Sequence, residues 1–281
     1  MEGVSKKNNK ASSFITRLIS GIFLIAALAF VLYRGGSLLF GVCLILSILG
    51  LIELFQVFNM ANSSLAYVAY LLTGFYYMMI MIYSSSGILL FLIALLLLLL
   101  MFYVFLYPKF DINHVSMIFF GIIYVAVTFS FIYLIRERNE LGKYFVWLVF
   151  ISSWGSDTCA YCTGMLFGKR KLSPILSPNK TIEGAIGGIL GAAILGAVYT
   201  YVMFNKINKD ISYSCIRVGV ACAIGAVISM IGDLTASAIK RDYNVKDYGN
   251  VIPGHGGILD RFDSVIFAAP ALYFILIIGA R

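Results

Sequence analysis

The chain has 281 residues, of which 61% are hydrophobic and only 12% are charged, and its mean hydropathy is +0.94. Soluble domains average about 45–50% apolar and about 25% charged residues, so this composition excludes a soluble enzyme or a nucleic-acid-binding module. The net charge of +8 indicates basic loops that contact anionic lipid at the cytoplasmic face of a membrane.

Apolar runs long enough to cross a bilayer follow one another along the chain. The first follows a basic N-terminal segment and predicts an uncleaved helix, since further spans come directly after it. From residue 35 to residue 108 the only charged side chain is Glu53. We predict an all-α integral membrane protein, a polytopic bundle of about nine transmembrane helices at 14–33, 37–58, 65–83, 87–107, 115–135, 144–166, 181–204, 214–239 and 262–280.

The two halves of the chain differ in polarity. Residues 1–135 carry few ionisable groups within the spans and are interpreted as N-terminal scaffold helices, whereas residues 136–281 form a C-terminal catalytic region with loops 167–180 and 240–261. With nine spans, 13 of the 21 Lys and Arg residues fall on the N-terminal side of the membrane. The positive-inside rule then places the N-terminus and both loops in the cytoplasm, in a cell inner membrane or plasma membrane.

Carboxylates within the C-terminal spans are the main sign of chemistry, because an ionisable group at membrane depth is costly and is by default a functional-site hypothesis. Asp157 and Asp233 lie within spans, and Asp260 and Asp263 open the last one on a shared helix face. We expect these segments to meet at one depth near the cytoplasm. Clustered carboxylates need a cation, and hard oxygen ligands shared with substrate phosphates are typical of Mg²⁺.

Several weaker interpretations remain open. A basic loop is often only a topology signal, and a carboxylate in a span can couple H⁺ or Na⁺ to transport, so a secondary transporter is the main alternative. A membrane transferase of the CDP-alcohol or prenyl type needs a D-G-x2-A-R or D-D-x2-D pattern, and neither occurs here. The C-x-x-C formed by Cys159 and Cys162 has no second ligand pair nearby and is not interpreted as a metal site.

Residues 237–263 match one continuous motif, S-x-apolar-K-R-x4-K-D-x-small-x2-apolar-P-x-H-G-G-apolar-x-D-R-apolar-D, at every fixed position. This stretch resembles the phosphatidate cytidylyltransferases, or CDP-diacylglycerol synthases. Residues 177–184 resemble a second element of that family, S-P-x-K-T-x-E-G, and residues 157–161 a third, D-T-x-A-Y. Asn179, Ile182 and Cys159 depart from the residues most common in those two elements.

The resemblance implies a homodimer, and a reaction in which CTP and phosphatidic acid give CDP-diacylglycerol and pyrophosphate at the cytoplasmic membrane face. It also implies Mg²⁺, with a second, monovalent cation such as K⁺. The carboxylates expected at the metal are Asp233, Asp260 and Asp263, and Lys240 and Arg241 complete the expected catalytic set. The residues expected to bind substrate are Ser177, Lys180, Thr181, Lys246, His255, Gly256, Gly257 and Arg261.

Overall fold

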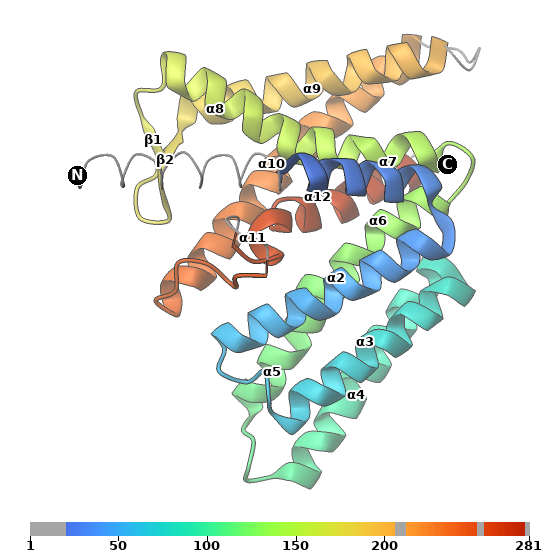
Figure 1. Ribbon diagram of the computed structural model, residues 1–281, viewed down its shortest axis with the longest axis vertical. Coiled ribbons are helices and arrows are strands. Elements are labelled where there is room, and N and C mark those ends of the chain that lie inside the picture. Colours follow the sequence, from blue (N-terminus) through green and yellow to red (C-terminus); the bar gives the residue numbers. More distant parts are fainter. Residues whose placement is uncertain (1–20, 206–211, 252–255, 279–281) are drawn as a thin grey trace, which may run out of the picture.

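The computed structural model describes residues 21–205, 212–251 and 256–278 (Figure 1). A helix over Gly21–Arg34 comes first. The helices that follow are α2 (Gly36–Val57), α3 (Ser64–Tyr83), η1 (Ser84–Ser86), α4 (Gly87–Leu106), α5 (Ile112–Gly121), η2 (Ile122–Val127), α6 (Thr128–Glu137), α7 (Gly142–Phe150), η3 (Ile151–Gly155), α8 (Ser156–Phe167), α9 (Ile182–Asn205), α10 (Ser212–Asp242), α11 (Leu259–Phe262), α12 (Val265–Leu272) and η4 (Tyr273–Ile278). The predicted all-α membrane architecture is therefore confirmed.

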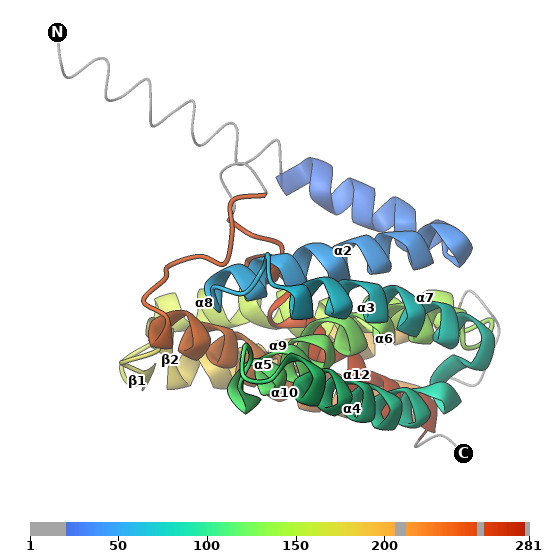
Figure 2. The same cartoon turned by 90° about the horizontal axis from the view of Figure 1, so that it is seen from below.

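The predicted count of nine spans is not confirmed. Within the described residues, five helical stretches are long and apolar enough to cross a membrane, namely Gly36–Val57, Ser64–Leu106, Ile112–Glu137, Ile182–Asn205 and Cys215–Asp242. The second of these holds both α3 and α4, which run side by side in Figures 1 and 2 and correspond to two predicted spans. The helix over 142–167 is not among the five, and its centre carries three serines, Ser152, Ser153 and Ser156, followed by Asp157.

The predicted loop 167–180 contains secondary structure that the sequence analysis did not anticipate. Strands β1 (Lys171–Ser173) and β2 (Ser177–Thr181) pair antiparallel, with Lys171 opposite Thr181. The Glu183 carboxylate accepts hydrogen bonds from the backbone N–H groups of Lys169 (3.0 Å) and Arg170 (3.2 Å). Thr181 Oγ1 accepts one from Gly184 N (3.1 Å), at the start of α9. These contacts fix the hairpin to the first turn of α9.

Small residues let α8, α9 and α10 approach closely. A Cβ atom added at Gly188 would lie 2.9 Å from the backbone oxygen of Ser156, and one added at Gly191 would lie 2.5 Å from Cys159. On the other side of α9, a Cβ at Gly196 would lie 2.4 Å from Cys222 Sγ in α10. Glycine faces of this kind are common where helices pack within membranes. They set the register that brings polar residues of the three helices together.

We expect Gly188→Ala to destabilise the protein by about 1–3 kcal/mol, because the new methyl group meets a backbone oxygen that cannot rotate away. Thermal unfolding in detergent measures this change. Leu190→Ala is the matched control, since Leu190 is exposed on the same helix and its truncation is expected to change stability by less than about 0.5 kcal/mol. Equal stability of the Gly188 variant and the wild type would contradict the close packing.

The N-terminal helices are tied to α6 at one end of the bundle. Arg136 donates hydrogen bonds from Nε to the backbone oxygen of Leu32 (2.9 Å) and from a terminal nitrogen to that of Tyr33 (3.1 Å). The adjacent Glu137 accepts one from Gly36 N (2.8 Å), where α2 begins. The helix Gly21–Arg34 is thereby held beside α2, as Figure 2 shows, and its inner face becomes one wall of the cavity described below.

Candidate functional site

A cavity of about 850 Å³ lies among the helix Gly21–Arg34, α8, the β-hairpin, α9, α10 and the α11–α12 turn. One part of its lining is apolar and includes Leu24, Ile25 and Leu28 from the first described helix. The other part is strongly polar. Its ionisable lining residues are Asp157, Lys180, Asp233, Asp260, Arg261 and Asp263. Carboxylates from three separate segments thus reach one cavity that also has an apolar wall.

Lys180 lies between two of these carboxylates. Its Nζ atom is 3.9 Å from Asp157 Oδ1 and in direct contact with Asp233 Oδ2. The three residues come from β2, α8 and α10, so this ion-paired group joins the hairpin to two helices. All three side chains line the cavity, although Nζ itself is buried between the two carboxylates.

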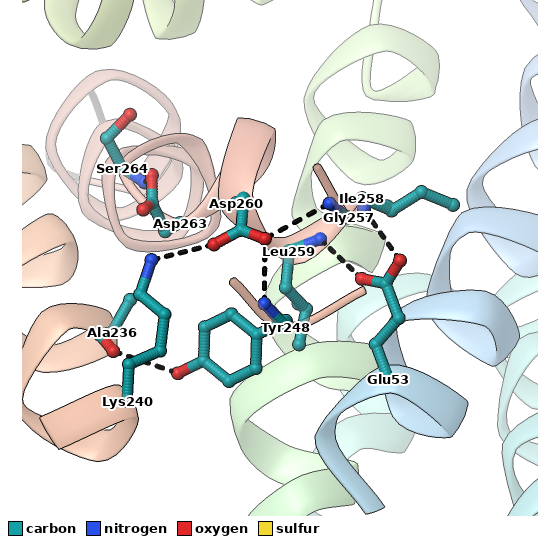
Figure 3. Close-up of polar contacts among 10 residues, drawn as sticks. All are labelled: Glu53, Ala236, Lys240, Tyr248, Gly257, Ile258, Leu259, Asp260, Asp263 and Ser264. Atoms are coloured by element: carbon teal, nitrogen blue, oxygen red, sulfur yellow. Dashed lines mark hydrogen bonds and ion pairs between the residues drawn. The ribbon is translucent and has the colours of Figure 1, made fainter. Parts of the chain in front are cut away.

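Asp260 is held by three donors, as Figure 3 shows. Its Oδ1 atom accepts from Lys240 Nζ at 2.7 Å, and its Oδ2 atom accepts from the backbone N–H groups of Tyr248 (2.8 Å) and Gly257 (3.1 Å). The Tyr248 hydroxyl donates to Ala236 O at 3.1 Å, and its ring centroid lies 5.2 Å from Lys240 Nζ. Asp260 therefore joins the start of α11 to Tyr248 and to Lys240 near the end of α10.

Asp263 is the least compensated carboxylate of the cavity. It is 8% exposed, and its Oδ1 atom accepts a hydrogen bond from the backbone N–H of Ser264 at 2.8 Å. Among the described residues, no ion pair with Asp263 is present. A cation or an additional donor in the cavity would stabilise its charged form.

The three carboxylates predicted to hold a metal do not form a ligand cage by themselves. In the described parts of the chain, no group of three or more His, Cys, Asp or Glu side chains is placed to hold a metal ion. Asp233 instead contacts Lys180, and Asp260 contacts Lys240. The structure brings all three to one cavity but leaves the metal assignment a prediction.

The other predicted site residues fall into three groups. Ser177, Lys180, Thr181 and Arg261 line the cavity. Gly256 and Gly257 lie beside Asp260, and Gly256 has a φ of +84°, which glycine adopts without strain. Arg241 and Lys246 are exposed and are not among the residues that line the cavity, and His255 lies outside the described residues.

Two residues outside the motifs support this site and were not predicted from the sequence. Glu53, assigned to the scaffold, contacts the backbone just before Asp260. Trp154 donates from Nε1 to the backbone oxygen of Arg261 at 3.3 Å. The signal for Glu53 was present, since it is the one charged residue in a long apolar stretch and such residues are functional candidates.

The fold and the cavity together define an integral membrane protein with a polar cavity that is bordered on one side by apolar surface. By comparison with known families, the chain belongs to the cytidylyltransferase family, which it matches over residues 15–278.

The curated relatives support this assignment. The chain is 41% identical over 167 residues to the phosphatidate cytidylyltransferase of Bacillus subtilis (strain 168), covering 59% of this chain and 60% of the relative. It is 38% identical over 169 residues to that of Staphylococcus aureus (strain COL) and 39% identical over 173 residues to that of Staphylococcus saprophyticus. These two alignments each cover 60% of this chain and 62% of the relative. The chain thus spans about three fifths of the length of the relatives it matches.

Proposed function

We propose that the protein transfers CMP from CTP to phosphatidic acid, giving CDP-diacylglycerol and pyrophosphate. The observation that carries this proposal is the cavity itself, in which fixed positive and negative groups lie beside an apolar wall. A phospholipid has an anionic headgroup and apolar chains, so it needs both kinds of surface. Membership of the cytidylyltransferase family supports CTP as the donor of the CMP group. The names of the relatives support phosphatidic acid as the acceptor.

The chemistry requires two polyanions to meet. A phosphate oxygen of phosphatidic acid attacks the α-phosphorus of CTP, and a new P–O bond forms. The bond between the α-phosphorus and the oxygen that bridges it to the β-phosphate breaks. Pyrophosphate leaves with that electron pair. A phosphate monoester has a second pKa near 6, so the attacking oxygen is already largely ionised at neutral pH and no general base is needed. The remaining task is to orient the partners and offset their charge.

The cavity side chains provide this electrostatic environment. Lys180 is held by Asp157 and Asp233 at the cavity, where its positive charge offsets theirs and lowers the repulsion that an incoming phosphate would meet. Arg261 lines the same cavity, and its backbone is fixed by Trp154. Gly256 and Gly257 allow the backbone to approach an anion closely. Lys240 is engaged by Asp260, so its first role is to hold that carboxylate in place.

The donor chemistry fits Mg²⁺ only together with substrate oxygens. Magnesium is usually held by one or two carboxylates, substrate phosphates and water, and Asp233 and Asp263 supply hard oxygen atoms on the cavity surface. When bound there, Mg²⁺ would offset charge on the triphosphate. A monovalent cation such as K⁺ is part of the same proposal.

The finer topology also belongs to this proposal. We infer nine spans with the N-terminus and the active site on the cytoplasmic side, on the strength of the Lys and Arg distribution. CTP then reaches the cavity from the cytosol while the acyl chains of phosphatidic acid remain in lipid. A homodimer is proposed only because the family resemblance implies one.

Pyrophosphate release tests the proposed function. The purified protein in detergent is mixed with phosphatidic acid, CTP and MgCl₂, and pyrophosphate is measured over time. We expect release that requires all three additions and stops when EDTA is added. Well-folded protein that releases no pyrophosphate under these conditions would contradict the proposal, and release without phosphatidic acid would contradict the lipid acceptor.

A further inference from the structure

Glu53 is a buried carboxylate that lies outside the motifs and contacts the loop that carries them. It belongs to α2 and is 2% exposed. Its Oε1 atom accepts a hydrogen bond from Ile258 N and its Oε2 atom accepts one from Leu259 N, both at 2.9 Å. Figure 3 shows the two oxygens facing two consecutive backbone N–H groups. More than 200 residues of chain separate the partners.

Glycines enclose the same carboxylate from two sides. A Cβ atom added at Gly257 would lie 2.6 Å from Oε2, and one added at Gly249 would lie 2.7 Å from Oε1. Both distances are too short for a real Cβ contact, so a side chain at either position would displace the Glu53 carboxylate. The contact therefore has a defined geometry.

The Glu53 contact continues directly into the Asp260 network. Gly257 N donates to Asp260, and the next two N–H groups along the chain donate to Glu53. The start of α11 is thus fixed by the Asp260 carboxylate of α11 itself and by the Glu53 carboxylate of a distant helix. Asp260, Arg261 and Asp263 follow within a few residues and line the cavity.

We propose that Glu53 is a positioning residue of the active site, which fixes the turn at residues 257–259 and so sets where Asp260 and Asp263 enter the cavity. This inference rests on the proposed CMP transfer for its effect on rate. Glu53 does not line the cavity. A displacement of reacting groups by about 1 Å can reduce a rate about 100-fold, so losing this contact is expected to lower kcat more than it changes KM.

The principal variant is Glu53→Gln, which keeps the size of the side chain but turns one acceptor into a donor that faces a backbone N–H. We expect kcat to fall at least about 10-fold while the KM for CTP changes less than about 3-fold. Hydrogen–deuterium exchange over residues 256–264 is expected to become faster. Gly249→Ala is a second variant, which displaces the Glu53 carboxylate without removing its charge and is expected to change both readouts in the same direction.

Ser47→Ala is the matched control. Ser47 is buried on the same helix and its Oγ lies 2.7 Å from the Tyr77 hydroxyl, away from the loop. We expect this variant to lose thermal stability while kcat and exchange over 256–264 stay within about 2-fold of the wild type. If Ser47→Ala, at an equal loss of stability, lowers kcat as much as Glu53→Gln does, Glu53 has only a structural role and the proposal is wrong.

The exchange measurement separates this inference from the proposed function. Unchanged exchange over 256–264 in both Glu53→Gln and Gly249→Ala would overturn the inference, whatever the activity. If the wild type transfers no CMP but exchange accelerates in the variants, the contact stands as the one that fixes the turn and the proposed function fails. If the wild type is active and Glu53→Gln retains its kcat, the inference fails and the function stands.

Discussion

Replacing Asp263 with asparagine is expected to reduce CMP transfer by at least about 100-fold, the scale seen when a group that stabilises charge in the transition state is removed. Asparagine has nearly the same shape and can still accept the hydrogen bond from Ser264 N, so the fold should be retained. What is lost is the negative charge at the least compensated carboxylate of the cavity. Initial rates of pyrophosphate release with CTP and phosphatidic acid measure the effect.

Asp242→Asn provides the control for that experiment. Asp242 is exposed at the end of α10 and does not line the cavity, so the same chemical change there is expected to leave the rate within about 2-fold. Asp263→Asn with near-normal activity would contradict the assignment of this carboxylate to the reaction. An equal loss in both variants would point to a general effect of net charge instead.

Lys180→Met is the second variant with a large expected effect. Methionine keeps most of the apolar stem but removes the ammonium group that lies between Asp157 and Asp233. The two carboxylates then repel an incoming triphosphate, and we expect kcat/KM for CTP to fall at least about 100-fold. Steady-state kinetics over a range of CTP concentrations provide the measurement.

Lys171→Met is the matched control for this substitution, since Lys171 is exposed on the partner strand of the same hairpin. Its kcat/KM is expected to stay within about 3-fold of the wild type, because an exposed charge is screened by solvent and salt. If Lys180→Met retained the kcat/KM of the control variant, the cavity would not use this ammonium group to bind CTP.

The continuous motif over residues 237–263 predicted which residues to consider but not how they pair. Asp233 and Lys240 both belong to α10, yet each contacts a residue from another segment, Lys180 and Asp260 respectively. Such partners depend on the register between helices, which glycine contacts on α9 help to set. The spacing of residues within one helix carries no information about how that helix is aligned against its neighbours.

Local interruptions of helices were also beyond the sequence analysis. The last predicted span, 262–280, is preceded by the short α11 and continues through α12 into a π-helical turn that begins at Tyr273. The β-hairpin at 171–181 is too short to show an alternating pattern, and its position depends on Glu183 and Thr181 at the start of α9. In both places tertiary contacts decide the local structure.

Glu53 shows the opposite case, in which the sequence contained the signal and the interpretation passed over it. A single carboxylate in an apolar stretch indicates a specific partner. The partner, two backbone N–H groups near residue 258, has no side-chain pattern that could be recognised in advance. The division into a scaffold half and a catalytic half is therefore bridged by at least one contact.

The most direct test of the account follows the α-phosphate of CTP. The purified protein is incubated with phosphatidic acid, MgCl₂ and CTP labelled at the α-phosphorus, and the lipid is extracted and counted. The account predicts that label enters the lipid in equal amount to the pyrophosphate released, and that Asp263→Asn and Lys180→Met both lose this transfer. Label that stays in the aqueous phase with folded wild-type protein would contradict the proposed transfer. Label that enters the lipid as well in both variants as in the wild type would contradict the roles of Asp263 and Lys180.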